Sequence, residues 1–156
     1  MFRLLAALVF LWSLPALAEN MTGPAKVIDG DTIEIQGQRV RLFGIDAPED
    51  KQTCQRDGQP WRCGKDATFA LADKIGVKPI ECEPKGKPDR YGRAIAVCRL
   101  NGEDLNAWLV FQGWALAYRQ FSLAYVPQEN EAKEAKRGVW ASEFIRPWKW
   151  RAGERQ

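Results

Sequence analysis

Two charged segments contain the residues whose side chains could perform chemistry. The first segment supplies three acidic groups and one arginine: Asp31, Arg41, Asp46 and Glu49. The second lies far downstream and ends in a further arginine, Arg93. Carboxylates hold hard divalent cations, and arginines bind phosphate through paired hydrogen bonds. If the two segments converge, they form a pocket suited to phosphodiester chemistry.

Each residue of this set suits a particular chemical role. Asp31, Asp46 and Glu49 supply the acid, and two direct carboxylates with a backbone carbonyl and waters would leave open coordination positions on a bound calcium ion. A metal bound there would polarise the phosphoryl group and neutralise developing negative charge. Arg41 and Arg93 could hold the equatorial oxygens of an in-line transition state. Glu49 could orient or deprotonate the attacking water, since a carboxylate is the natural choice in a chain that lacks histidine.

Each short motif also has a purely structural explanation. Asp29-Gly30-Asp31-Thr32 alone is most often a turn. Asp46-Ala47-Pro48-Glu49 alone is most often a strand exit, and Tyr91-Gly92-Arg93 alone is a hairpin tip. Each pattern is weak by itself, and only the set in this order is informative.

Strand geometry sets a condition on the shared pocket. Arg41 and Asp46 have opposite parity, so a flat strand would direct them to opposite faces. Both reach one pocket only if the backbone bends between them. We expect the bend at Gly44, as a bulge or kink.

The composition limits the classes of function. The chain has 156 residues, a one-domain length, and is 46% hydrophobic and 28% charged. Its net charge of +3 fits a nucleic-acid partner without requiring one. The sequence contains no histidine, which excludes a Ser-His-Asp triad, a Cys-His dyad and histidine-ligated zinc. A general base must therefore be Asp, Glu, Lys, Tyr or Cys.

The N-terminus has the pattern of a signal peptide. Arg3 precedes an apolar run over 4–14, and Ala16-Leu17-Ala18 offers a cleavage site before Glu19. We therefore expect residues 1–18 to be removed and the protein to be exported to the periplasm or the medium, with no stable membrane association. The alternative is a retained membrane anchor, for which the apolar run is short.

Export allows the four cysteines to be interpreted as disulfides. Cys82 and Cys98 are symmetric about the middle of a turn predicted over 87–92, so they would face each other in an antiparallel hairpin. Cys54 and Cys63 enclose a short polar loop. We predict the pairs Cys54–Cys63 and Cys82–Cys98. The alternative is a four-cysteine zinc site, which would lack any C-x-x-C pair.

The elements that must position these residues are short strands and three helices. After a loose leader over 19–25, extended segments are expected over 26–28, 32–35, 39–45, 77–82, 94–100 and 115–118. Helices are expected over 65–75, 105–112 and 127–137, with the core residues Ala67, Leu71, Ile75, Leu105, Trp108 and Leu109. This order fits a small closed barrel with helices packed against it, within one domain over 26–140 and a C-terminal tail over 141–156.

The motifs in this order resemble the thermonuclease, or staphylococcal-nuclease-like, family. Three blocks carry the resemblance: Asp29-Gly30-Asp31-Thr32, Arg41-Leu42-Phe43-Gly44-Ile45-Asp46-Ala47-Pro48-Glu49 and Asp89-Arg90-Tyr91-Gly92-Arg93. Weaker similarity continues to Trp140, so it spans nearly the whole chain after the leader. The resemblance implies an α+β fold: an OB-like five-stranded β-barrel with three helices.

The resemblance also implies a calcium-dependent phosphodiesterase that cuts DNA and RNA with low sequence specificity and leaves 3′-phosphate ends. By position, the implied calcium ligands are Asp31, Asp46 and the backbone carbonyl of Ala47. Glu49 would act on the water, Arg41 and Arg93 would bind the phosphate, and Tyr91 would lie near a terminal phosphate. This chain departs from the best-known member at Ala47, which replaces a threonine and so loses a hydroxyl contact.

Two aromatic features each allow two interpretations. The family's cleft tyrosines do not map cleanly here; Tyr118 could stack a nucleic-acid base or pack against the core. The tail Trp148-Lys149-Trp150-Arg151 could bind nucleic acid or pack back on the fold.

A rival function is a noncatalytic OB-like nucleic-acid-binding module. A structural calcium-binding domain is a third, but it would not need Arg41 or Arg93. We expect a monomer that acts on DNA, RNA or both.

Overall fold

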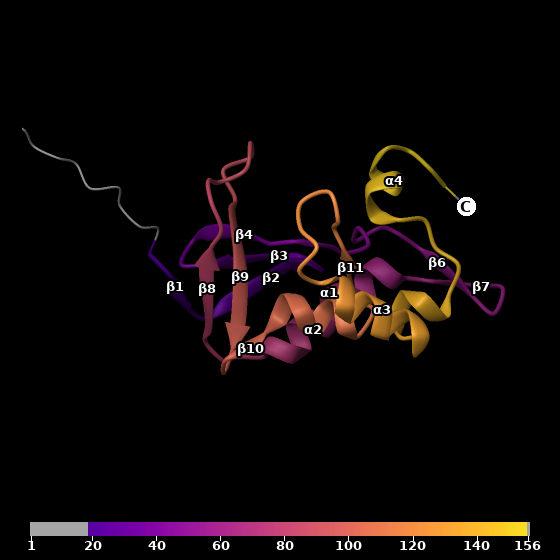
Figure 1. Ribbon diagram of the computed structural model, residues 1–156, viewed down its shortest axis with the longest axis horizontal. Helices are drawn as coiled ribbons and strands as arrows, with labels where there is room; N and C mark the ends of the chain where they lie inside the picture. The colour runs from indigo at the N-terminus through magenta and orange to yellow at the C-terminus, as the bar shows by residue number, and fades with distance from the viewer. Residues whose placement is uncertain (1–18, 156) are drawn as a thin grey trace, which may run out of the picture.

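A curled sheet forms one end of the molecule, and helices lie beneath it (Figure 1). The computed structural model describes residues 19–155, so the predicted signal peptide lies outside the described residues. The sheet has seven strands in the order β1-β8-β9-β4-β3-β2, with β10 on β9. Its strands are β1 (Met21–Gly23), β2 (Ala25–Asp29), β3 (Thr32–Ile35), β4 (Gln38–Leu42), β8 (Ile80–Pro84), β9 (Ala94–Leu100) and β10 (Glu103–Asp104).

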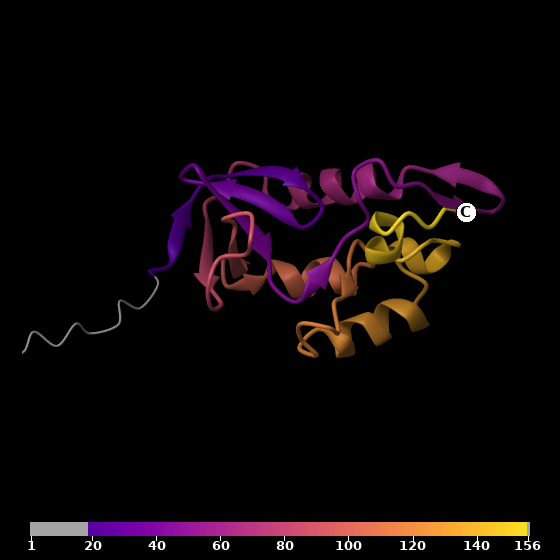
Figure 2. The same ribbon diagram turned by 90° about the horizontal axis from the view of Figure 1, so that it is seen from above.

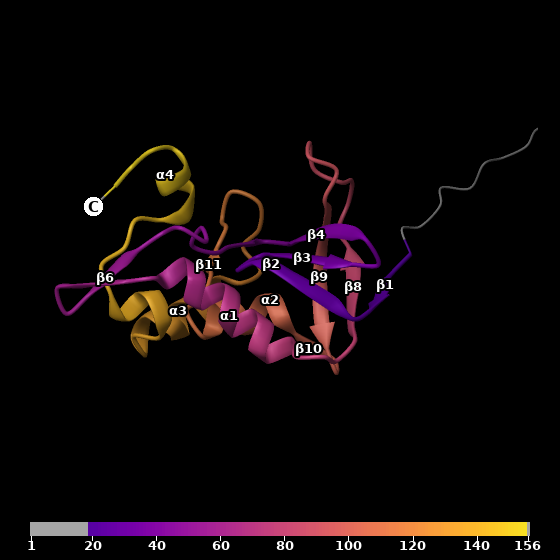
Figure 3. The ribbon, with the colours of Figure 1, turned by 180° about the vertical axis from the view of Figure 1, so that it is seen from behind.

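All pairings in this sheet are antiparallel except the one between β4 and β9. The buried side chains of β3 and β4 alternate as a half-buried sheet requires: Ile33, Ile35, Val40 and Leu42. The predicted α+β, OB-like fold is confirmed, but the main sheet has seven strands instead of the expected five and forms a curled half-barrel instead of a closed barrel. Figure 3 shows the same curvature from behind.

Two small sheets complete the β structure. Strand β5 (Ile45–Asp46) pairs with β11 (Leu116–Ala117), and β6 (Cys54–Arg56) pairs with β7 (Gln59–Trp61). The predicted loop between Cys54 and Cys63 is therefore a β-hairpin. Its turn, Asp57-Gly58, has positive φ at both positions, as two-residue hairpin turns favour.

Helices α1 and α2 pack against the sheet and α3 packs on α2, so that Figure 2 shows α2 between α1 and α3. The helical segments are α1 (Cys63–Ile75), α2 (Leu105–Phe111), α3 (Val126–Glu134), the 3₁₀ turn η1 (Gly138–Ala141) and the short α4 (Pro147–Arg151). The core positions predicted for α1 are buried, as are Leu105 and Leu109 of α2. Trp108 differs: it lies half-buried at the edge of the core, with the Lys74 ammonium over its ring.

The structure corrects the expected loose leader. Residues 21–23 form strand β1, which pairs with β8 so that Met21 lies opposite Cys82. An exposed edge of β8 would leave backbone hydrogen-bonding groups open, and β1 satisfies them. Likewise the strand expected from residue 77 begins at Ile80, because α1 ends at Gly76 and Val77 lies exposed after it.

Both predicted disulfides are present. Cys54 pairs with Cys63, and Cys82 pairs with Cys98, whose positions are directly opposite on β8 and β9. These pairings exclude the alternative of a four-cysteine zinc site. Cys54 and Cys63 also belong to a second small core with Leu116 and Val139, against which Trp148 packs.

Among residues 19–155, no helix is long and apolar enough to cross a bilayer.

Candidate active site

The two charged segments meet in one cleft of about 1090 Å³. In Figure 1 the β8–β9 turn, the loop between β11 and α3, and α4 all rise on one side of the molecule, away from α1 to α3. Most of the residues predicted for the site line this cleft: Asp31, Arg41, Ala47, Glu49, Tyr91, Arg93 and Tyr118. The remaining one, Asp46, is fully buried and hydrogen-bonded to an arginine that lines the cleft.

Arg41 joins the two aspartates at the floor of the cleft. Its Nη1 donates to Asp31 Oδ1 at 2.6 Å, and its Nη2 donates to Asp46 Oδ1 at 2.8 Å. The side chain of Arg41 is 18% exposed, that of Asp31 6% and that of Asp46 0%. Charge-assisted hydrogen bonds between such buried groups are strong, and they fix the relative positions of the three residues.

A break in the backbone makes this contact possible. Strand β4 ends at Leu42 and β5 begins at Ile45, with Gly44 between them at a φ of +72°. A Cβ on Gly44 would also lie 3.1 Å from the ring of Tyr125. The buried Asn106 holds the break, because its Nδ2 donates to the carbonyl of Phe43 at 2.9 Å. The predicted bend at Gly44 is therefore confirmed.

Asp31 is held in place by the turn between β2 and β3. Its backbone N–H donates to Asp29 Oδ1 at 3.0 Å, which is the short-range bond typical of an aspartate turn. Its own carboxylate accepts hydrogen bonds from the Thr32 hydroxyl at 3.2 Å and the Ala47 N–H at 2.8 Å. The hydrogen bond from the Ala47 backbone to the Asp31 side chain thus joins the Asp46-Ala47 segment to this turn.

The carboxylates of the site are crowded and partly removed from water. Burial raises the pKa of Asp29 to about 6, and the negative charge of Asp31 adds to this shift. Burial also raises the pKa of Asp46, although hydrogen bonds and charges from two arginines oppose it. For Arg41, burial lowers the pKa, but the neighbouring aspartates outweigh burial and hold it above its usual value. Such perturbed groups in a cleft are typical of functional sites.

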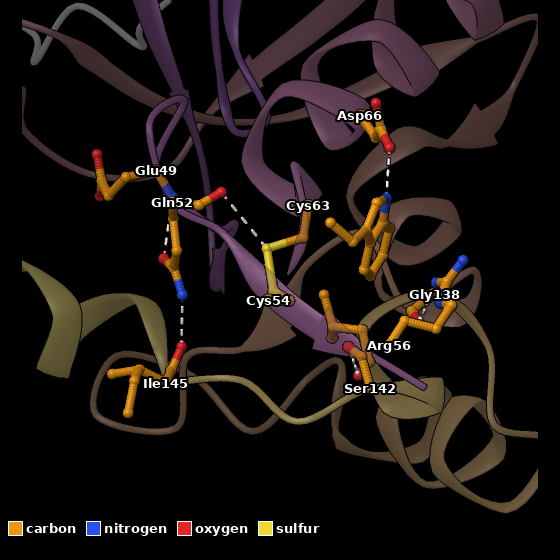
Figure 4. Close-up of a disulfide and its surroundings, with 11 residues drawn as sticks. Glu49, Gln52, Cys54, Arg56, Cys63, Asp66, Gly138, Ser142 and Ile145 are labelled. Carbon is orange, nitrogen blue, oxygen red and sulfur yellow. Dashed lines mark hydrogen bonds between the residues drawn. A yellow bond between two sulfur atoms is a disulfide. The ribbon is translucent and has the colours of Figure 1, made fainter. Parts of the chain in front are cut away.

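Glu49 projects from a loop that packs closely on the start of α1. A Cβ on Gly64 would lie 1.7 Å from the Glu49 carbonyl oxygen, so this approach requires glycine. The buried Gln52 then fixes the loop: its N–H donates to the Glu49 carbonyl at 2.7 Å, and its Oε1 accepts from the Glu49 N–H at 3.2 Å (Figure 4). The Glu49 side chain stays 34% exposed at the cleft.

Arg93 reaches the cleft from the β8–β9 turn. Its Nε donates to Asp89 Oδ2 at 2.8 Å, and its Nη1 lies 3.5 Å from the Thr32 hydroxyl. Asp89 in turn accepts from the backbone N–H groups of Tyr91 and Arg93. Burial raises the pKa of Asp89, but these hydrogen bonds from Arg93 and Tyr91 outweigh it and leave the pKa low. The phenol ring of Tyr91 lies exposed beside the Arg93 guanidinium.

Tyr118 packs between the β11–α3 loop and the C-terminal segment. Its ring stacks on Trp148, with centroids 5.4 Å apart and planes 10° apart, and meets the edge of Phe121 at 4.8 Å. One face of the ring is therefore covered by the protein itself. This contact favours the packing interpretation for Tyr118, and it places the tail tryptophan Trp148 back on the fold.

Arg151, at the end of α4, also belongs to the site, although no sequence motif indicated it. Its Nη1 and Nη2 donate to Asp46 Oδ1 and Oδ2, each at 2.9 Å, and its Nη1 also donates to Glu49 Oε1 at 2.6 Å. Partial burial lowers the pKa of Arg151, but these hydrogen bonds outweigh it and hold the pKa above its usual value. The contact joins residues far apart in the chain, and no local pattern indicated it.

The oxygen atoms at the floor of the cleft match the preference of a hard cation. Carboxylates and backbone carbonyls are the ligands that calcium takes, and Asp31, Asp46, Glu49 and Ala47 supply both kinds here. Within the described residues, however, no three acidic or cysteine side chains already stand as a metal-binding cluster. Arginines occupy the oxygens of Asp46. The types of donor atom fit a hard divalent cation.

Comparison with known proteins shows the family of this chain. The family model described as "Staphylococcal nuclease homologue" matches residues 39–142. Succinoglycan biosynthesis protein ExoI of Rhizobium meliloti (strain 1021) is 41% identical over 143 residues, covering 89% of this chain and 74% of that protein. A micrococcal nuclease of Shigella flexneri is 34% identical over 164 residues (94% and 88%), and an uncharacterized endonuclease of Escherichia coli 32% over 160 residues (97% and 98%). The chain belongs to the staphylococcal nuclease homologue family.

Proposed function

We propose that this protein is an exported, calcium-dependent phosphodiesterase that hydrolyses DNA, RNA or both and leaves 3′-phosphate ends. The observation that carries the proposal is the contact of Arg41 with both Asp31 and Asp46, in a cleft that Glu49 and Arg93 also line. A noncatalytic binding module would need a basic groove and aromatic platforms but no such cluster of buried acids. The names of the endonuclease and micrococcal nuclease relatives support the same class of activity.

The arginines are proposed to bind the scissile phosphate. Arg41 and Arg93 present guanidinium groups to the cleft from β4 and from the β8–β9 turn. Planar guanidinium groups match the equatorial oxygens of the phosphoryl group and stabilise the charge that develops there. Because these contacts address phosphate and not bases, we expect low sequence specificity. The ring of Tyr91 is exposed beside Arg93, and it is proposed to contact a terminal phosphate.

Glu49 is proposed to act on the attacking water. Its carboxylate is partly exposed at the cleft, while its backbone is fixed by Gln52. Asp31, Asp46 and the Ala47 carbonyl would hold calcium, which would supply positive charge to polarise the phosphoryl group. Gln52 holds the backbone of Glu49 and Asp89 holds the side chain of Arg93. Groups held in this way favour catalysis through their relative positions.

We also propose export to the periplasm or the medium, as a monomer. Two disulfides support an oxidising compartment, because such bonds rarely persist in the cytosol. The signal-peptide pattern of residues 1–18 points the same way. Size-exclusion chromatography with light scattering on the secreted protein tests whether it is a monomer in solution.

The role of Glu49 provides the test of the mechanism. Glu49→Gln keeps the shape of the side chain and removes its basic carboxylate, so the cleavage rate of single-stranded DNA in calcium should fall by about 10²–10⁴-fold. Asp50→Asn is the matched control: Asp50 is the neighbouring exposed carboxylate, paired with Lys65. Its cleavage rate should equal that of the wild type. Equal rates for Glu49→Gln and Asp50→Asn would remove Glu49 from the mechanism.

A further inference from the structure

We propose that Arg151 is an internal cation that occupies the carboxylate site and competes with a divalent cation for it. Binding of the cation would displace the Arg151 side chain from Asp46 and Glu49. The inference rests on the proposed function, since it assumes that a divalent cation binds these carboxylates. It adds a regulatory contact: the C-terminal segment (residues 141–155) would keep the site closed to cations of low affinity or low concentration.

The contact geometry is the first support. Arg151 meets Asp46 through two parallel hydrogen bonds of 2.9 Å, one to each carboxylate oxygen, and it reaches Glu49 at 2.6 Å. A paired contact of this kind is the strongest form of an arginine–carboxylate interaction. Arg41 also donates a hydrogen bond to Asp46 Oδ1. A cation that takes both oxygens of Asp46 as ligands therefore competes with Arg151 for them.

The second support is that the C-terminal segment is anchored beside the site. Gln55 and Glu143 exchange two backbone hydrogen bonds of 2.8 Å, which join the segment to the β6–β7 hairpin. Gln52, whose Oε1 holds Glu49, donates from its Nε2 to the Ile145 carbonyl at 2.6 Å (Figure 4). The ring of Trp148 then stacks on Tyr118. The position of Arg151 thus follows from contacts along the whole segment.

The difference in exposure between the two partners indicates which of them moves. The Asp46 side chain is fully buried, while the Arg151 side chain is 36% exposed on a helix of five residues. The guanidinium of Arg151, which is 36% exposed, has room to swing into water, whereas Asp46 is fixed by the Gly44 break and by Arg41. Displacement of Arg151 leaves Asp46 with the Arg41 contact and with oxygen lone pairs for the cation.

Calcium binding without nucleic acid tests the competition directly. Isothermal titration calorimetry would compare the wild type with Arg151→Gln and with Arg155→Gln. Arg155 is a matched control: it lies in the same segment, carries the same charge, and donates to the carbonyls of Trp150 and Glu154, away from the carboxylates. We expect Arg151→Gln to bind calcium about tenfold more tightly than the wild type, because a charge-assisted competitor is removed. Arg155→Gln should bind as the wild type does.

A second measurement follows the segment itself. Hydrogen exchange of the α4 amides should speed up in the wild type when calcium is added, since Arg151 then no longer ties α4 to the site. The same amides in Arg151→Gln should show no response to calcium. If Arg151→Gln does not fold, Arg151→Lys should give an intermediate gain in affinity, because lysine keeps the charge but not the paired contact.

The outcomes separate this inference from the proposed function. Equal calcium affinity in Arg151→Gln and Arg155→Gln, with calcium-dependent cleavage intact, would overturn the competition and leave the proposed function standing. Weaker binding in Arg151→Gln would also overturn it, since Arg151 would then assist the cation. Absence of calcium binding in all variants would refute the cation requirement of the proposed function and this inference with it.

Discussion

Arg41 and Arg151 both hydrogen-bond to Asp46, yet one side chain comes from the sheet and the other from the C-terminal segment. Arg41 lies on β4, whose neighbours β3 and β9 fix it on both sides, and it is 18% exposed. Arg151 lies on the five-residue helix α4 and is 36% exposed. The same chemical group can thus serve as a fixed part of a site in one place and as a replaceable occupant in another. The difference lies in the backbone that carries each arginine: β4 is paired with two strands, whereas α4 is a helix of five residues.

Among the residues of this comparison, the largest effect is expected from Arg41, on the sheet side. Arg41→Ala should lower kcat/KM for single-stranded DNA by about 10²–10³-fold, because a phosphate-binding guanidinium is lost. It should also lower the free energy of unfolding by about 3–5 kcal/mol, since the buried Asp31 and Asp46 lose their common partner. Chemical denaturation and steady-state kinetics on one preparation measure both. An activity within a few-fold of the wild type would place Arg41 in a structural role only.

Arg93 should come next, because it reaches the cleft from a turn. Arg93→Ala should reduce kcat/KM by about 10²-fold, through loss of a second guanidinium at the phosphate. Lys87→Ala is the control, an exposed basic residue in the same β8–β9 connection that does not line the cleft. An equal loss in both variants would mean that general positive charge, and not a contact by Arg93, explains the effect.

The smallest effects on catalysis should come from the disulfide nearest the C-terminal segment. Replacing both Cys54 and Cys63 by serine should destabilise the fold by about 2–4 kcal/mol and loosen the hairpin that anchors the segment. Calcium affinity should then rise a few-fold, in the direction of Arg151→Gln, while the cleavage rate at saturating calcium should change little. Calorimetry and cleavage assays at a temperature where the variant remains folded measure these effects.

The other disulfide supplies the contrasting control. Serine at both Cys82 and Cys98 removes the same kind of bond from β8 and β9, the strands that hold the Arg93 turn. Here the cleavage rate should fall and calcium affinity should stay unchanged. If both double variants behave alike, the separation between a fixed sheet side and a replaceable C-terminal side is wrong.

Local patterns predicted the sheet side of the site well. The acidic motifs marked Asp31 and Asp46, strand parity required a bend at Gly44, and the symmetric spacing of Cys82 and Cys98 gave their pairing. These features depend on residues that are near in sequence or opposite in one hairpin. The Asp57-Gly58 pair is typical of a two-residue hairpin turn, and it indicates a hairpin within the predicted loop. No local pattern indicates that this hairpin anchors the C-terminal segment.

The C-terminal side could not be predicted in the same way. The contact of Arg151 with Asp46 joins residues 105 positions apart, and it depends on how Gln52 and Gln55 hold the intervening segment. Neither glutamine belongs to a motif. Strand β1 was missed for a similar reason, because its residues pair with β8, which lies much later in the chain. Contacts of this kind follow from packing and not from a local pattern.

Calcium-dependent cleavage by the wild-type protein is the most direct test of the central claim. The mature protein would be incubated with end-labelled single-stranded DNA in calcium and, separately, in excess chelator, and the product ends would be identified. We predict cleavage in calcium only, with fragments that carry 3′-phosphate groups. DNA that stays intact in calcium but is retarded on a native gel would contradict the claim and favour a binding module. Cleavage that persists in chelator would contradict the calcium mechanism.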